Sequence, residues 1–166
     1  MAYPRQIRNF NAFLDGISYF GIATEAKMPD PKIRTAAHRG SGMDAPVGVD
    51  MGMEGMSAEL TFAEWNPVVL AKLGRNERLV LRPAAMGEGN MFDTDTIIVT
   101  VGGLITTHEF GALKPGEPST LKMMIDLRYY RFEHNGEELW EIDIEAGKRV
   151  IGGVDQLAEI RRAMGI

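Results

Sequence analysis

The sequence has no cysteine, no long hydrophobic run and no excess of basic residues. Without cysteine there are no disulfide bonds or thiolate metal sites, which favours folding in a reducing compartment. Because nowhere do about 18 apolar residues run together, the sequence predicts no membrane span, and its polar N-terminus predicts no secretion signal. The net charge of -5, from 23 acidic and 18 basic residues, argues against binding of duplex DNA through bulk charge.

The length and the hydrophobic content of the chain are sufficient for the core of one domain. The chain has 166 residues, 45 % of them hydrophobic, and a chain of this length buries roughly 70 % of its unfolded surface. It contains no repeat and no linker. We therefore predict a single domain over residues 1–166, with a polar N-terminal tail at 1–9 and an extended arm at 32–56.

The sequence pattern predicts strands over most of the chain. Asp15-Gly16 and Asn135-Gly136 each lie between apolar runs and have the composition of a two-residue hairpin turn. The first strand is predicted to begin at Phe10, and further strands are predicted at 57–62, 77–82 and 96–110. Gly102-Gly103 predicts a bulge or bend within the last of these.

The second hairpin has a register that the sequence predicts. Pairing His134 with Glu137 across the turn sets Arg131 opposite Trp140, where a cation-π contact is expected. The same pairing sets other apolar residues opposite one another: Phe132 with Leu139, Tyr129 with Ile142, and Leu127 with Ile144.

Two helices are predicted. Asn66 is a capping residue, Pro67 suits the first helical position, and Gly74 closes the segment. A short C-terminal helix is predicted from Asp155 to Gly165. Strand-rich architecture with few helices predicts a mainly β domain.

The arm at 32–56 lacks aromatic residues and is rich in glycine and methionine. Its first limb is basic, its second is acidic, and a turn from Gly40 to Pro46 separates them. In the second limb, apolar residues alternate with glycine and acidic residues over 47–54, as in an extended strand. A two-stranded ribbon with one apolar edge is marginal in water, so we expect the arm to dock on its own domain or on another subunit.

No enzyme chemistry is predicted. The three histidines, His38, His108 and His134, lack metal-ligand spacing. The oxygen-rich segment 93–96 lacks the glycine and distal glutamate of a calcium loop. The sequence shows no nucleophile motif and no phosphate-binding loop, so we expect no catalytic, metal or cofactor site. The methionines of the arm, at 43, 51, 53 and 56, suit either an irregular core or an adaptable contact surface.

The residues resemble a known family, the major tail tube proteins of contractile-tailed bacteriophages and the related tailocins. Three segments carry the resemblance: PRQIRNFNAFLDGISYFG, then HRGSGMDAPVGVDMGMEGM followed by AELTF, and the ending YYRFEHNGEELWEIDIEAGKRVIGGVDQLAEIRRAMGI. Residues 77–117 match only by position and strand pattern, and His38 stands where an aromatic residue is usual.

The resemblance implies a tail-tube β-sandwich or barrel with one flanking helix and a short C-terminal helix, assembled as hexameric rings. The rings stack into a hollow tube inside the sheath, and the tube penetrates the host envelope and conducts DNA. The implied partners are further copies of the chain, the tail sheath protein, the baseplate and tail terminator proteins, and the tape-measure protein and DNA in the lumen. The implied location is the virion tail, assembled in the host cytoplasm.

Two sets of residues follow as hypotheses. The arm is expected to contact neighbouring subunits, with its charged limbs meeting opposite charges and ordering only on assembly. Glu25 and Glu59 are expected to face the lumen, since an acidic wall does not retain DNA. The predicted arm contacts are Arg34, His38, Arg39, Met43, Asp44, Val47, Val49, Asp50, Met51, Met53 and Glu54.

Two alternatives remain open on the sequence. One is a tube of the same architecture in a tailocin, a secretion system or an extracellular injection system, which carries no DNA. The other is a β-barrel enzyme or binder of small ligands, which predicts a monomer with a pocket and convergent polar groups.

Overall fold

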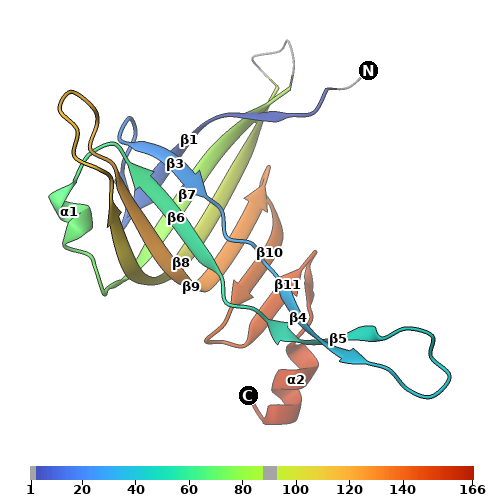
Figure 1. The fold of residues 1–166 in the computed structure, drawn as a ribbon. Helices are drawn as coiled ribbons and strands as arrows, with labels where there is room; N and C mark the ends of the chain where they lie inside the picture. The colour runs from blue at the N-terminus through green and yellow to red at the C-terminus, as the bar shows by residue number, and fades with distance from the viewer. Residues whose placement is uncertain (1–2, 88–92) are drawn as a thin grey trace.

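The computed structural model describes residues 3–87 and 93–166. Figure 1 shows a strand-rich body, a two-stranded arm that leaves it at one end, and a short helix near the base of the arm. The prediction of a mainly β fold is confirmed. The elements are β1 (Gln6–Leu14), β2 (Ile17–Ser18), β3 (Ala23–Lys27), β4 (Ile33–His38), β5 (Val47–Met53), β6 (Ser57–Phe62), α1 (Pro67–Leu70), β7 (Asn76–Met86), β8 (Thr94–Phe110), β9 (Leu121–His134), β10 (Glu137–Asp143), β11 (Lys148–Ile151), β12 (Val154–Asp155) and α2 (Ala158–Met164).

The body is one branched, antiparallel sheet. Its strands follow the order β12-β11-β10-β9-β8-β7-β1-β2, and β9 also pairs with β6, which pairs with β3. The first half of β9 pairs with β6 and the second half with β10. In Figure 1, β3 and β6 cross in front of β7 and β8, which gives two layers. In the described part of the chain no strand pairing joins β3 to β1 or β2, so the layers form an open sandwich and not a closed barrel.

The core lies between these layers and follows from strand alternation. On β6, Ala58, Leu60 and Phe62 are buried while the residues between them face outward. The strand predicted at 96–110 is present as β8, and its alternating aliphatic residues Ile97, Val99, Val101 and Ile105 are buried. The largest fully buried side chains are Tyr130, Phe62, Leu14, Leu60, Leu79, Leu81, Ile105, Leu121, Met123, Ile125, Val69 and Val99.

Both predicted hairpin turns are present. Asp15 (φ 51°) and Asn135 (φ 49°) are followed by glycines that also have positive φ, as a type I′ turn requires. The first strand begins at Gln6, earlier than predicted at Phe10, because residues 6–9 of the predicted tail pair with β7. Residues 1 and 2 of that tail lie outside the described residues.

The strand pairing is irregular at Gly102-Gly103, as predicted, but the extra residue lies on β9 and not on β8. Gly102 pairs with Tyr129 and Gly103 with Leu127, so Arg128 has no opposite residue on β8. This extra residue changes the phase of β9, so that Leu127 and Tyr130 are both buried. A Cβ atom on residue 103 would lie 1.9 Å from the Asp126 carbonyl oxygen, so the approach of the two strands requires glycine.

The predicted register of the second hairpin is correct only at its tip. His134 pairs with Glu137, but a bulge between Glu138 and Trp140 shifts the rest by one residue. The shift stacks Trp140 on Phe132, with ring centroids 4.7 Å apart. The observed pairs are Phe132 with Trp140, Arg131 with Glu141, Tyr130 with Ile142, and Tyr129 with Asp143.

The expected cation-π contact between Arg131 and Trp140 is therefore wrong. The Arg131 guanidinium instead forms ion pairs with Glu133 (2.7 Å) and Glu138 (3.1 Å), two carboxylates of the same hairpin. The register shift removes Trp140 from the position opposite Arg131 and gives that position to Glu141.

Both helices are short. The Asn66 side chain accepts a hydrogen bond from the Val68 amide at the start of α1, as predicted. The helix is shorter than predicted, because it ends at Leu70 with Ala71 as its C-cap and not at Gly74, whose positive φ belongs to the turn that follows. Helix α2 begins at Ala158, later than the predicted Asp155, because Val154 and Asp155 form β12. It ends before a left-handed Gly165 and has no buried residue. No helix in residues 3–87 and 93–166 is long and apolar enough to cross a membrane.

Candidate functional site

The predicted arm is a hairpin of β4 and β5 that forms a sheet of its own. His38 pairs with Val47, Ala36 with Val49, and Thr35 with Asp50. Every residue of β4 is exposed. Figure 1 shows the ribbon projecting from the body, away from α1. The structure thus brings most of the predicted contact residues together on one projecting element, whereas Met53 and Glu54 lie at its base.

One edge of the arm is apolar and exposed. Val47, Val49 and Met51 have exposed fractions of 50 %, 46 % and 63 %. The predicted alternation does not continue to Met53, because the register shifts at the base of the hairpin, where Gly52 has a φ of 105°. Met53 packs against the core of the body. The exposed apolar edge therefore ends at Met51.

The methionines of the arm differ in role, since some fill an irregular core and one suits a contact surface. Met56 is buried in the core and Met53 packs against it, so both fill an irregular core. The sulfur of Met43 lies 3.0 Å from the Gly40 amide nitrogen and closes the turn of the arm. Met51 is exposed. Among the four, only the position of Met51 suits an adaptable contact surface.

The base of the arm is attached to the body by an ion pair. Asp50 on β5 accepts a hydrogen bond of 2.5 Å from the guanidinium of Arg149 on β11, whose side chain is 6 % exposed. The other Asp50 oxygen accepts from the Gly52 amide within the bulge. The hydrogen bond from Arg149, followed by the one from Gly52, lowers the pKa of Asp50 below its usual value.

The sequence did not reveal this attachment. Asp50 and Arg149 are 99 residues apart, and no local pattern connects them. A second pair at the base, Lys32 with Glu54 at 3.3 Å, is exposed and contributes little.

These two pairs neutralise much of the acidic limb. Asp50 and Glu54 have basic partners, whereas Arg34 and Arg39 form no ion pair with any described residue. The Arg39 Nε donates to the Met43 carbonyl oxygen at 3.2 Å, within the arm itself. Among the charged residues of the arm without an ion pair to a described residue, Arg34 and Arg39 are basic and Asp44 is acidic.

Glu25 and Glu59 lie on the outer face of the sheet made by β3, β6 and β9. Residues 58, 60 and 62 of β6 face the core, so Glu59 faces outward, and Glu25 lies on the same side of β3. Lysines accompany them: Lys27 is opposite Glu59, and Lys122 lies 3.6 Å from it. This outer face is therefore mixed in charge.

The three histidines are scattered. His38 is exposed on the arm, His134 lies 3.4 Å from Asp95, and His108 lies beneath α1. Burial lowers the pKa of His108, and neither of its ring nitrogens has a hydrogen-bond partner among the described residues. The part of the chain that the structure describes holds no group of three potential metal ligands.

The oxygen-rich segment 93–96 is occupied by contacts within the chain. Arg5 pairs with Asp93 at 2.6 Å and with Asp95 at 3.3 Å. The Asn135 amide donates to Asp95 at 2.9 Å, which is the main reason that the pKa of Asp95 is lowered. These contacts join the start of β1 to the tip of the β9–β10 hairpin.

An apolar cavity of about 240 Å³ opens between β1 and β3, at the seam where the sandwich does not close. A binding pocket for a small polar ligand needs convergent polar groups, and this cavity offers only apolar walls. The lining residues are Ile7, Phe10, Ala26, Met28, Leu81, Pro83, Ile97 and Phe132.

Comparisons with known proteins identify the family of the chain. A family model described as phage tail tube protein FII matches residues 4–165. The tail tube protein of Escherichia phage P2 is 28 % identical over 172 residues, covering 100 % of both chains. The major tail tube protein of Serratia phage KSP20 is 27 % identical over 154 residues, covering 87 % of this chain and 85 % of the relative. The chain therefore belongs to the phage tail tube protein FII family and is a structural subunit of a phage tail tube.

Proposed function

We propose that six copies of this chain form a ring, and that rings stack into a hollow tube in which the arm of each copy contacts a neighbouring copy. The observation that carries the proposal is the exposed apolar edge of the arm, Val47, Val49 and Met51, on a ribbon that pairs with no other strand of the described residues. A two-stranded ribbon of this kind is marginal in water, and a neighbouring copy supplies the missing surface.

The proposed tube lies inside a contractile sheath, crosses the host envelope and conducts DNA. Its further partners are the tail sheath, baseplate, tail terminator and tape-measure proteins, and it is assembled in the host cytoplasm. The family membership supports this set, because a tail tube has to join each of these components during assembly or ejection.

The outer face of β3, β6 and β9 is the proposed lumen wall, with Glu25 and Glu59 on it. DNA carries one charge per about 1.7 Å, so a basic wall would hold it through many phosphate contacts. The lysines at 27 and 122 lie close to Glu59, so their charge is offset locally. A structure of the assembled tube in which this face lines a net basic channel, or points away from the channel, would contradict the assignment.

The arm is tested by replacing residues 36–49 with Asn-Gly. Thr35 and Asp50 are cross-strand partners, so a two-residue turn bridges the cut while Asp50 stays beside Arg149. We expect a monomer with the unfolding transition of the wild-type body that forms no tubes in negative-stain microscopy. Long tubes from this variant would show that the arm is not the contact between copies. Wild-type protein that stays a compact monomer at every concentration would overturn the proposed function itself.

A further inference from the structure

A second exposed apolar surface lies at the end of the body opposite the arm. Trp65, just before α1, packs edge-to-face against Phe110 at the end of β8, with ring centroids 5.0 Å apart. The Trp65 indole nitrogen donates to the Thr120 carbonyl oxygen at 3.0 Å, which fixes the ring. We call the exposed residues at this end the aromatic platform: Trp65, Val68, Phe110 and Leu113.

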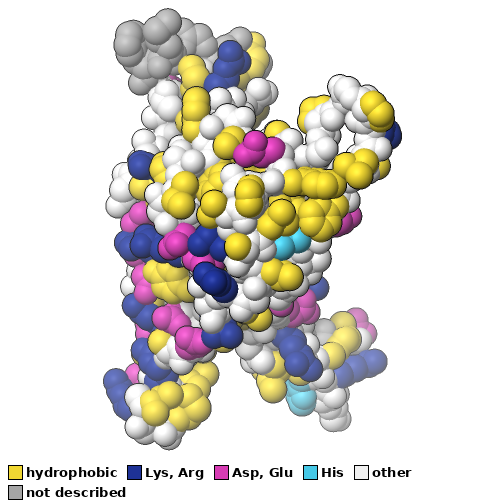
Figure 2. All heavy atoms as spheres, turned by 90° about the vertical axis from the view of Figure 1, so that its left-hand side faces the viewer, with side chains coloured by type: hydrophobic (Ala, Val, Ile, Leu, Met, Phe, Trp, Pro, Cys, Tyr) yellow, Lys and Arg dark blue, Asp and Glu magenta, His cyan; other side chains and the backbone are white. Residues whose placement is uncertain are grey.

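The platform lies beside the core but is itself exposed to solvent. Leu121, the cross-strand partner of Phe110, is fully buried, whereas Phe110 is 53 % exposed and Leu113 is 72 % exposed. Figure 2 faces this end of the molecule and shows hydrophobic side chains gathered there. Single exposed apolar residues are common, but two exposed aromatic rings in contact with each other are typical of a contact surface.

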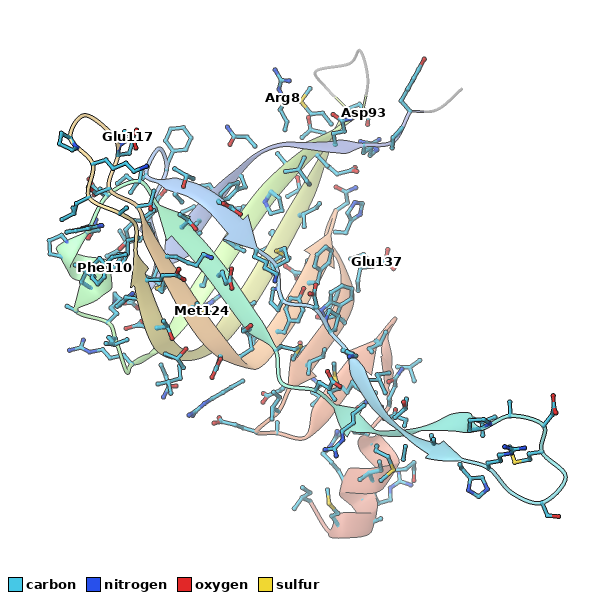
Figure 3. The ribbon with its side chains drawn as sticks, in the orientation of Figure 1. Arg8, Asp93, Phe110, Glu117, Met124 and Glu137 are labelled. Carbon is cyan, nitrogen blue, oxygen red and sulfur yellow. The ribbon has the colours of Figure 1, made fainter. Side chains whose placement is uncertain are left out.

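The platform and the arm cannot meet within one copy. Figure 3 labels Phe110 at the α1 end, while the arm projects from the other end of the body. A contact between two different surfaces at opposite ends of a subunit is heterologous, and it repeats from copy to copy instead of closing in a pair. A subunit of a tail tube needs such a contact.

The charges beside the two surfaces are opposite in sign. Glu64 precedes Trp65 and Glu109 precedes Phe110, and both glutamates are exposed and in no ion pair with a described residue. Lys122 is the cross-strand partner of Glu109, but its charge is offset by Glu59 at 3.6 Å. The arm presents Arg34 and Arg39, which are also exposed and without an ion-pair partner among those residues. Opposite charges around apolar surfaces steer association and select a single partner.

We propose that the aromatic platform of one copy is the receptor for the arm of the next copy. Val47, Val49 and Met51 pack on Trp65 and Phe110, and the basic limb of the arm lies toward the acidic residues beside the platform. Aromatic anchors that receive aliphatic and methionine side chains are characteristic of the energetic centre of an interface. The proposal rests on the proposed function in one respect, that the arm contacts a neighbouring copy.

Disulfide mapping tests the contact directly, because the chain has no native cysteine. Val49→Cys is placed in one preparation and Phe110→Cys in another, and the two are mixed, assembled and oxidised. A disulfide forms only when the two Cα atoms lie about 4.4–6.8 Å apart, so Met51→Cys is included as a second position on the arm. We expect a linked dimer from the mixture of arm and platform variants and none from either variant alone.

Helix α2 provides the matched control, since it also exposes apolar residues and lies near the base of the arm. Met164 on α2 is 61 % exposed, and Met164→Cys is mixed with Phe110→Cys in the same way. A link from Met164 in place of the arm positions would overturn the proposal and make α2 the occupant of the platform. Links between two arm positions alone would make the contact an arm-to-arm pairing, which also overturns it.

A second measurement does not depend on cysteine geometry. Phe110→Ser is compared with Ile144→Ser, which removes a side chain of similar exposure (50 %) far along the chain from the platform. We expect Phe110→Ser to raise the concentration needed for tube formation by about tenfold or more, as loss of an interface anchor does. Ile144→Ser is expected to leave that concentration unchanged, and equal effects of the two would overturn the proposal.

The outcomes separate this inference from the proposed function. If the cysteine variants form tubes in negative-stain microscopy but no arm-to-platform link appears at either arm position, the inference fails and the proposed function stands. If the unsubstituted chain forms no rings or tubes under any condition, the proposed function fails first.

Discussion

The body and the arm are held in place by different physical forces. The body buries alternating aliphatic and aromatic residues between two layers of sheet, so its stability arises from apolar surface removed from water. The arm buries almost nothing, exposes every residue of β4, and is attached through Asp50 and Arg149. Helix α2 resembles the arm in this respect, since it has no buried residue and is held by Arg161 and Asp155. Substitutions in the body should therefore change folding, whereas those in the arm should change assembly.

The largest difference in unfolding free energy is expected between the variants Leu60→Ala, in the body, and Val49→Ala, in the arm. Leu60 is fully buried on β6, and its truncation leaves a cavity that costs about 2–5 kcal/mol of unfolding free energy. Val49 is half-exposed on the arm, so its truncation changes the same free energy by less than about 0.5 kcal/mol. Urea unfolding of the two monomers measures both values. A loss of similar size at the two positions would show that the arm belongs to the folded core.

A smaller loss of unfolding free energy is expected from Gly103→Ala than from Leu60→Ala. The added Cβ would lie 1.9 Å from the Asp126 carbonyl oxygen, so the backbone of β8 or β9 has to move, at a cost of about 1–3 kcal/mol. Gly102→Ala is the control, because its Cβ would meet the Tyr129 Cβ only at an ordinary 3.7 Å. Urea unfolding should separate the two neighbours clearly. Equal stabilities would mean that the bulge does not depend on glycine.

Asp50→Asn should loosen the arm and leave the body intact. Asparagine still accepts the hydrogen bond from Gly52 but no longer carries the charge that faces the buried Arg149. Hydrogen exchange of the amides in 33–38 and 47–50 is expected to become severalfold faster, with unchanged exchange in β8 and β9. Glu54→Gln removes only the exposed pair with Lys32 and should have little effect. An arm that exchanges equally in all three proteins would contradict the role of Asp50.

The smallest effect is a pH dependence at α2. The hydrogen bond from Arg161 lowers the pKa of Asp155 to about 2, below the value of about 3.9 of an unfolded chain. Because the folded pKa is the lower one, the stabilisation is fully present above about pH 4 and is lost as the pH falls through about 2. Unfolding free energies of the wild type and Asp155→Asn, measured from pH 5 to pH 2, should converge toward the acidic end. A constant difference across this range would contradict the linkage.

Features set by neighbouring residues were predictable from the sequence. Asp15-Gly16 and Asn135-Gly136 form their turns because both central positions need positive φ, which these residue types tolerate. The bulge at Gly102-Gly103 and the cap at Asn66 follow from equally local chemistry.

Features set by distant residues were not predictable. The bulge before Trp140 shifts the hairpin register and stacks Trp140 on Phe132. The residues of the turn do not predict this shift. The polar start of β1 becomes a strand only because β7 lies beside it. The attachment of the arm needs Arg149, far along the chain, so the arm could be predicted as a ribbon but its anchor could not. The assignment of its residues to subunit contacts stays a prediction.

Hydrogen exchange of the arm in the monomer and in the assembled tube tests the central claim most directly, that the arm is completed by a neighbouring copy. We predict that amides in 33–38 and 47–53 exchange fast in the monomer and slowly in the tube, while the buried strands β8 and β9 are protected in both states. Equal exchange of the arm in monomer and tube would contradict the account.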